Sequence, residues 1–329
     1  MPVLRCCFLI VPLAACLTAQ SPVIIDTDAG SDDLMAIAFL LSRKDVKIEA
    51  ITIVDGLAHV PAGAANVLRL LQLAGATGVP VYPGAGEPLE RTAPFPAKWR
   101  QTSDTLPGVK LPPARRKPEE RRATDFLVAR LGVPGRPVSI LALGPLTNLG
   151  DAFRRAPQCV RSVTELVIMG GAVGARGNLD DGGFFKTPNT TAEWNLFHDP
   201  LAAEIVFHSG VSMRMIPLDA TNKVPIDTAF LQELSRARTP LAEVVAQILE
   251  TERPLIEQKI FFAWDPLAAV ALVDPTVVAT RQIGIEILRK APEQGRTKEV
   301  SSRRPNVTVA LDANAAEFKK VFLEAFHNR

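Results

Sequence analysis

The chain has 329 residues, of which 47% are hydrophobic, so it can build a large buried core. Its formal net charge at pH 7 is +2, which gives no strong attraction to phosphate backbones. We therefore expect a folded protein without a nucleic-acid partner. A locally basic stretch, ARRKPEERR at 114–122, also contains glutamates and is interpreted as a solvated loop and helix start.

Residues 1–20, MPVLRCCFLIVPLAACLTAQ, predict a signal peptide, because one Arg precedes an apolar run of the usual length. The run is too short for a membrane span. Within it, LAAC at 13–16 resembles the lipobox of bacterial lipoproteins, in which Cys16 would become the lipidated first residue. Ordinary cleavage near Ala19 is the alternative. In both cases we expect an exported protein, periplasmic or lipid-anchored at the cell envelope, whose folded body covers 21–329.

The folded body alternates short apolar runs with longer helical patterns. The patterns predict strands at 23–27, 47–54, 138–143, 165–170 and 212–218, and helices at 33–43 and 62–75. The first helix is apolar on nearly all sides, and the second ends at Gly75. Continuous apolar strands separated by helices indicate an α/β fold with a mostly parallel sheet covered on both faces.

Two stretches interrupt this alternation and are predicted to be long loops. Residues 83–122 are rich in Pro, Arg and Gly and contain Trp99, whereas residues 174–191 are rich in Gly and Asn. Long ordered loops in compact proteins of this class often carry function. Ligands of such sheets bind beyond the carboxyl ends of the strands, which is where Asp26 and Asp28 lie.

The first strand is followed by an unusual cluster of acidic residues, Asp26, Asp28, Asp32 and Asp33. One of them could cap the following helix, but capping does not explain four. Oxygen ligands are what Ca²⁺ prefers, so the cluster indicates a metal site or a catalytic site. Haloacid-dehalogenase-like phosphatases also begin with Asp-x-Asp after an apolar strand. That alternative expects a Gly-Thr-like pair next, whereas AGSDD follows here.

A further acidic ligand has two candidates, because the sequence DPLAA occurs twice. Asp199 begins one copy and Asp265 begins the other. Asp followed by Pro is also favourable at the start of a helix. Spacing alone therefore does not separate a helix cap from a metal ligand.

Six motifs in order resemble the inosine-uridine-type nucleoside hydrolases. They are DTDAGSDD at 26–33, ALGPLTNL at 142–149, VIMGGAV at 167–173, AEWNLFHDPLAAEIVF at 192–207, WDPLAA at 264–269 and PNVTVALDANAAEF at 305–318. The first departs from that family's D-x-D-P-G-x-D-D only in Ala29. The resemblance implies a single open, mostly parallel sheet flanked by helices. It also implies hydrolysis of a nucleoside to free base and ribose, in a homo-oligomer that is a dimer or a tetramer.

The resemblance implies one Ca²⁺ and assigns roles to individual residues. The matching metal ligands are Asp28, Asp33, the backbone carbonyl of Leu143, and Asp265, which leaves Asp199 as a helix cap. Asp28 would also be the general base that takes a proton from the Ca²⁺-bound water. Asp26 would support the ligands from behind. The residues matched to substrate contacts are Asp32, Asn178, Glu193 and Asn195 for the ribose, and Met169 for the pocket wall, where it could equally be a buried strand residue.

Two tryptophans bear on the preferred base. Trp264 stands where many members of the family have a His, and Trp99 lies in about the place where the purine-preferring branch has a second Trp, in the loop after its third strand. This pair resembles the purine-preferring branch, in which aromatic rings stack on the base, at about 1–3 kcal/mol per base. We therefore favour purine nucleosides. The alternative is that both rings serve packing only.

A departure at Leu57 favours a different function. The family's usual Gly-Asn is Gly56-Leu57 here, so an expected ribose-contacting Asn is missing. Asp55 or His59 could compensate, and His59 is the one His that we expect near the site, with the other three on the surface or in helices. The alternative is a non-catalytic protein that binds a nucleoside or a sugar. The complete acidic set, with Asp28, favours catalysis.

Overall fold

The computed structural model of the chain describes residues 22–180, 183, 185–301 and 305–327. The predicted signal peptide at 1–20, with Cys16 and Ala19, lies outside the described residues. None of the described helices is long and apolar enough to cross a membrane.

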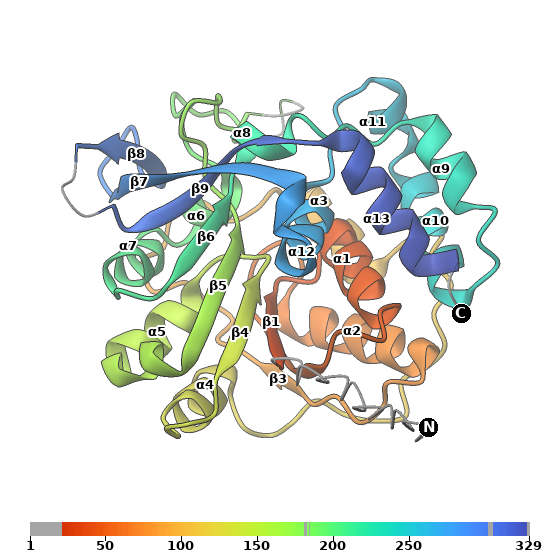
Figure 1. Cartoon of the computed structure of the whole chain (residues 1–329), viewed down its shortest axis with the longest axis horizontal. Helices are drawn as coiled ribbons and strands as arrows, with labels where there is room; N and C mark the ends of the chain where they lie inside the picture. The colour runs from red at the N-terminus through yellow and green to blue at the C-terminus, as the bar shows by residue number, and fades with distance from the viewer. Residues whose placement is uncertain (1–21, 181–182, 184, 302–304, 328–329) are drawn as a thin grey trace, which may run out of the picture.

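Within the described residues, nine strands form one sheet in the order β3-β2-β1-β4-β5-β6-β9-β7-β8 (Figure 1). The strands are β1 (Val23–Thr27), β2 (Ile48–Ile53), β3 (Val81–Pro83), β4 (Val138–Ala142), β5 (Val163–Met169), β6 (Met213–Ile216), β7 (Val278–Leu288), β8 (Arg296–Val300) and β9 (Val307–Ala313). β7 runs antiparallel to both β8 and β9, and the remaining pairs are parallel. The predicted open, mostly parallel sheet is confirmed.

Helices cover both faces of the sheet. They are α1 (Ser31–Leu41), α2 (Val60–Ala74), α3 (Ala97–Thr105), α4 (Ala123–Leu131), α5 (Thr147–Arg155), α6 (Trp194–His198), α7 (Pro200–His208), α8 (Leu218–Thr221), α9 (Thr228–Leu234), α10 (Pro240–Thr251), α11 (Arg253–Glu257), α12 (Trp264–Val273) and α13 (Ala315–His327). Short 3₁₀ turns cover Pro157–Ser162 and Pro275–Val277.

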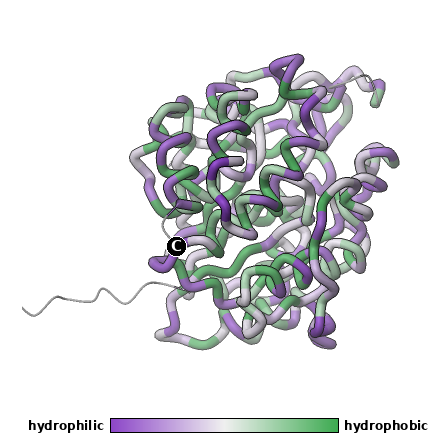
Figure 2. Tube along the Cα trace, turned by 90° about the vertical axis from the view of Figure 1, so that its right-hand side faces the viewer, coloured by the Kyte–Doolittle hydropathy of each residue, from purple (hydrophilic) through white to green (hydrophobic). Residues whose placement is uncertain are grey.

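Successive residues of a strand belong to different cores. Ile24 packs in the core beneath α4, α5 and α7, whereas Ile25 packs in the core beneath α1, α2, α10 and α12. These helix groups lie on the left and the right of the sheet in Figure 1. Burial on both faces explains why the strands are continuously apolar in sequence. Along the helices that face the viewer in Figure 2, hydrophobic and hydrophilic residues alternate, as expected for helices with one buried side.

The first two predicted helices are confirmed. α1 is buried from Asp33 to Phe39 and beyond because it packs against α2, α10 and α12 as well as the sheet. α2 is followed by Gly75, which takes a left-handed φ of 71° that a residue without a Cβ adopts readily.

The prediction of an irregular loop over 83–122 is partly wrong, because α3 lies inside it. The helix AKWRQTSDT buries only Ser103, so it has no apolar periodicity to detect. Polar contacts hold it instead. Nδ2 of Asn66 donates to the carbonyl of Ser103 at 3.0 Å, for example. The other predicted loop is irregular over 174–180.

The sheet order places a crevice beside β1. The chain passes from β1 outward through β2 to β3, and then returns to the other side of β1 at β4. Parallel neighbours whose connections leave in opposite directions open a crevice at their carboxyl ends. Asp26 is in register with Ala142. Asp28 and Leu143, which follow these strands, therefore lie at adjacent strand ends.

Candidate active site

A cavity of about 830 Å³ opens at these strand ends. Every residue that the sequence analysis assigned to the metal or the substrate lines it: Asp28, Asp32, Asp33, Trp99, Leu143, Met169, Asn178, Glu193, Asn195, Trp264 and Asp265. These residues come from parts of the chain more than 230 positions apart, from the end of β1 to the start of α12. The fold therefore brings the whole predicted set to one cavity.

The turn between β1 and α1 holds Asp33 in place. The Thr27 hydroxyl donates to Oδ1 of Asp33, and the backbone N–H of Gly30 donates to Oδ2 at 3.0 Å. Thr27 Oγ1 in turn accepts the N–H of Ala29 at 3.0 Å. Ala29 has a φ of 56°, an unfavourable value for a residue with a Cβ. The turn thus carries local strain while it directs a carboxylate into the cavity.

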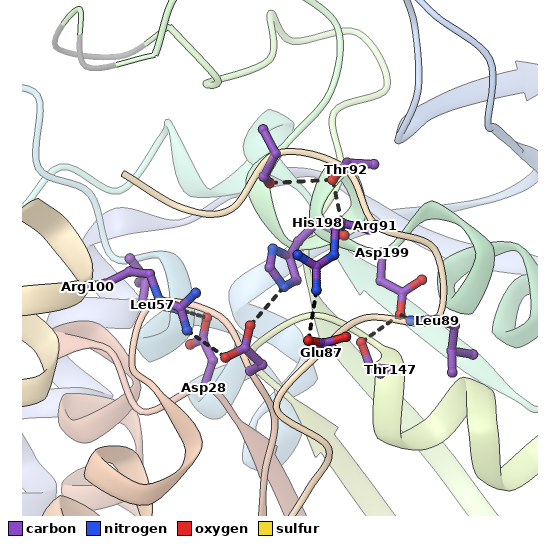
Figure 3. A network of polar contacts seen from close by, with 12 residues as sticks. Asp28, Leu57, Glu87, Leu89, Arg91, Thr92, Arg100, Thr147, His198 and Asp199 are labelled. Carbon is purple, nitrogen blue, oxygen red and sulfur yellow. Dashed lines mark hydrogen bonds and ion pairs between the residues drawn. The ribbon is translucent and has the colours of Figure 1, made fainter. Parts of the chain in front are cut away.

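Backbone groups pack closely around Asp28. Its Oδ2 accepts the N–H of Leu57 at 2.7 Å (Figure 3). A Cβ added to Gly56 would lie 2.1 Å from this oxygen, and one added to Gly144 would lie 2.9 Å from the Cβ of Asp28. Leu57 therefore contributes its main chain to the site, where the resemblance led us to expect a polar side chain.

The two residues proposed to compensate for Leu57 do not line the cavity. Asp55 is 6% exposed and accepts Nη2 of Arg100 at 2.5 Å. The exposed His59 places Nδ1 2.7 Å from Oδ2 of Asp104, because it precedes α2 and faces α3. The prediction that either residue compensates is wrong.

The two DPLAA copies differ in where their helices begin. Asp199 precedes α7, and its Oδ1 accepts the N–H of Ala202 at 3.0 Å, as a helix cap does. Oδ2 of Asp199 accepts the Thr147 hydroxyl at 2.7 Å (Figure 3). Relative to the repeated sequence, α12 begins two residues earlier, at Trp264, so Asp265 lies inside its first turn and caps nothing. The structure therefore identifies Asp199 as a helix cap and Asp265 as a cavity carboxylate, a distinction that sequence spacing did not allow.

The cavity carboxylates form one oxygen-rich cluster. Oxygens of Asp32, Asp33 and Asp265 lie within 4.8 Å of one another. Burial, and then the charge of Asp33, raises the pKa of both Asp28 and Asp265 well above the usual range and raises that of Asp32 to about 8. None of the four forms a salt bridge with a Lys, Arg or His in the described part of the chain. These ligand atoms are all oxygens, and no salt bridge balances their negative charge, so the cluster fits a hard divalent cation.

Asp26, which was expected to support the ligands from behind, does not line the cavity. Its Oδ1 accepts Nδ2 of Asn148 at 2.8 Å and the Thr52 hydroxyl at 2.5 Å. Its Oδ2 has no hydrogen-bond partner among the described residues. Burial raises the pKa of this carboxyl to about 7.

Three polar residues form another part of the wall. The Glu193 carboxylate accepts the backbone N–H groups of Asn195 at 2.9 Å and Gly171 at 3.0 Å, and burial raises its pKa to about 7. Nδ2 of Asn195 donates to the Leu143 carbonyl at 2.9 Å. Asn178 is fixed through Oδ1, which accepts the N–H of Trp194 at 3.2 Å. These side chains are held by the main chain before any ligand binds.

Aromatic rings line the cavity in two groups. Trp264 lies 5.2 Å from the ring of Phe261, centroid to centroid. Trp99 lies 5.7 Å from Trp194 in an edge-to-face contact, and Trp194 stacks on Phe95 at 4.9 Å. Phe95 and Trp194 were not expected in the wall. Trp194 stands between two motif residues in AEWN, which could have pointed to it, whereas Phe95 lies in a stretch without a motif.

Glu252 is another cavity residue that sequence reasoning missed. It lies between α10 and α11, and burial raises the pKa of its carboxyl. No local pattern around it marks a site.

Comparison with known proteins identifies the family. The family model described as "inosine-uridine preferring nucleoside hydrolase" matches residues 23–320. The pyrimidine-specific ribonucleoside hydrolase RihA of Enterobacter sp. (strain 638) is 32% identical over 314 residues, which cover 92% of this chain and 96% of that protein. Uridine nucleosidase 1 of Arabidopsis thaliana is 33% identical over 256 residues, 77% of this chain and 74% of that one.

A solved structure agrees with these relatives. The purine-preferring ribonucleoside hydrolase from Gardnerella vaginalis superposes with a TM-score of 0.81 at 27% identity, covering 93% of this chain and 98% of that one. The family match extends over nearly all of the described residues. The chain therefore belongs to the inosine-uridine preferring nucleoside hydrolases, enzymes that act on N-glycosyl bonds.

Proposed function

We propose that this protein is a Ca²⁺-dependent hydrolase of purine ribonucleosides that uses Asp28 as its general base. The observation that carries the proposal is the cavity in which Asp28 adjoins an uncompensated cluster of carboxylates. Asp28, Asp33, Asp265 and the Leu143 carbonyl would hold the cation. When bound, Ca²⁺ supplies a positive charge that acidifies a water molecule and orients ribose hydroxyls.

The residues of the chain account for the remaining chemistry. Asp28 takes a proton from water, whose oxygen bonds to the anomeric carbon as the C–N bond breaks. The base leaves with the bonding pair and takes up a proton, so the products are free base and ribose. Glu193 and Asn195 are positioned to bind the ribose, because the backbone N–H groups of Gly171 and Asn195 hold the Glu193 carboxylate and the Leu143 carbonyl holds the Asn195 side chain. Such preorganisation limits the entropy lost on binding.

The preference for purines rests on the aromatic residues. The related proteins differ in the base that they prefer, because RihA is named pyrimidine-specific and the Gardnerella vaginalis hydrolase is named purine-preferring. The cavity of this chain offers Trp264 in one aromatic group and Trp99 with Trp194 in the other. Larger bases gain more from stacking on such faces. We therefore infer that purines are the better substrates.

We also propose that the protein is exported through the signal at 1–20 and acts as a homo-oligomer in salvage, releasing bases for uptake. Support for export comes from the sequence pattern alone. The family resemblance is the support for assembly.

The Asp28→Asn variant tests the proposed base. Asn presents an oxygen that can still accept the Leu57 N–H, so the side chain keeps its place and loses its charge and basicity. Saturating Ca²⁺ is used in the assay, because Asp28 is also a proposed ligand of the cation. We expect turnover of inosine to fall by about 10³-fold or more, with the inosine Kd within about fivefold of wild type. A variant that keeps most of its activity would show that Asp28 is not the base. If the wild type binds inosine and never releases the base, a binding protein is the better description.

A further inference from the structure

A buried ion pair lies next to the cavity without lining it. Nη2 of Arg100 donates to Oδ1 of Asp55 at 2.5 Å, and the side chains are only 11% and 9% exposed. On the other side of the carboxylate, Nε2 of the buried His198 lies 3.4 Å from Oδ2 (Figure 3 labels Arg100 and His198). Neither the proposed chemistry nor the metal cluster uses these three residues.

The pair connects two parts of the cavity wall. Asp55 is followed directly by Gly56 and Leu57, the residues that pack against Asp28 and donate a hydrogen bond to it. Arg100 follows Trp99 in α3. A single ion pair therefore links the turn that holds the proposed base to the helix that carries one of the aromatic rings.

α3 depends on polar contacts of this kind. Ser103 is its only buried residue, and its apolar contact with the rest of the protein is made by the partly buried Trp99, which packs against Trp194. Near its end, Asn66 donates to the carbonyls of Ser103 and Asp104, and His59 contacts the Asp104 carboxylate. Next to Trp99, the ion pair with Asp55 adds a charge-assisted hydrogen bond between two largely buried side chains, and hydrogen bonds of this kind are strong.

We propose that Asp55 and Arg100 are positioning residues, which together hold Trp99 against the substrate base and keep the 55–57 turn pressed against Asp28. The proposal deepens the proposed function and rests on it. Neither residue touches the substrate. They act on the reaction indirectly, by holding Trp99 and the Leu57 N–H in position.

The test compares Arg100→Met with Arg91→Met. Arg91 lies in the same segment and pairs with Glu87, but both side chains are more than 70% exposed, so their pair contributes little (Figure 3). Purified full-length proteins, shown to be folded by circular dichroism at the assay temperature, are assayed with inosine and Ca²⁺. For Arg100→Met we expect KM to rise about tenfold, as for the loss of one stacking contact, and kcat to fall as well. For Arg91→Met we expect both constants within twofold of wild type.

Two further variants keep the test decisive if Arg100→Met folds poorly. Arg100→Lys keeps the positive charge beside Asp55 and should recover part of the kcat/KM that Arg100→Met loses. If Arg100 served only the stability of the fold, two folded variants would have the same kcat/KM. The double variant Asp55→Asn/Arg100→Met leaves no unpaired charge. It should lose no more kcat/KM than the worse single variant, because the two residues act as one unit. Additive losses, or unchanged kinetics in Arg100→Met, would overturn the proposal.

Hydrogen exchange separates this proposal from the proposed function. The amides of 97–105 should exchange faster in Arg100→Met than in wild type and Arg91→Met, a readout that needs no substrate. If the wild type hydrolyses no nucleoside, the proposed function fails and the exchange rates still report whether the pair holds α3. If the enzyme is active and exchange in 97–105 is unchanged, the positioning role is refuted.

Discussion

The most direct perturbation of the proposed base is Gly56→Ala. Gly56 does not have a left-handed φ, so its backbone can accept alanine. The obstacle is Asp28, whose Oδ2 and Cβ would lie 2.1 and 2.6 Å from the new methyl group. Relief of this overlap requires the carboxylate to move by about 1 Å, a displacement that costs about 10²-fold in rate at a reacting centre. Overpacking should also cost about 1–3 kcal/mol of the free energy of unfolding.

The matched control for this variant is Gly86→Ala. A methyl group there meets no described atom within 4 Å, and the φ of Gly86 is also outside the left-handed region. We expect kcat/KM for inosine to fall about 100-fold in Gly56→Ala and to stay within twofold of wild type in Gly86→Ala. Kinetics are measured at saturating Ca²⁺ and below both melting temperatures. A Gly56→Ala enzyme within threefold of wild type would refute the close packing of Gly56 against a catalytic Asp28.

Asp265→Ala should weaken Ca²⁺ binding in calorimetry by at least tenfold, whereas Asp199→Ala should leave it unchanged and lower the free energy of unfolding by about 1–2 kcal/mol through the lost cap; equal effects would contradict the division of roles. In EDTA, the free energy of unfolding by urea should fall as pH rises from about 4 to 8. Burial raises the pKa of Asp32 to about 8 and of Glu193 to about 7, so the folded state keeps protons that the unfolded state releases. Stability that rises over this range would contradict the raised pKa values. Trp264→Ala should reduce turnover of inosine more than turnover of a riboside with a nitrophenolate leaving group, and equal losses would remove the stacking argument.

The sequence predicted the central strands and the cavity residues because both have simple physical signatures. A strand buried on both faces is a continuous apolar run, and parallel strands bring their carboxyl ends to one edge. Asp28 and Leu143 follow two such runs, so their proximity could be expected. No strand was predicted beyond residue 218, although β7, β8 and β9 complete the sheet. β8 is polar RTKEV at the edge of the sheet, and β7 is half exposed, so neither has that signature.

Features set by distant contacts could not be predicted. α3 has no apolar side, and polar partners such as Asn66 hold it. His198 was expected in a helix or on the surface. It ends α6, which agrees with the first of these, but it is only 2% exposed, and Asp55, 143 positions earlier, lies beside it. The roles of Asp199 and Asp265 depend on a shift of two residues in the start of a helix, which is finer than sequence patterns resolve.

We propose that purine nucleosides are hydrolysed at this cavity in a metal-dependent reaction. The most direct measurement is the release of free base and ribose from inosine, guanosine, uridine and cytidine by the folded body from Ser21, with Ca²⁺ and after EDTA. We predict release from inosine and guanosine that EDTA abolishes and Ca²⁺ restores, with much slower release from the pyrimidine nucleosides. Release that persists in EDTA, or no release from any of the four while Ca²⁺ binds, would contradict the account.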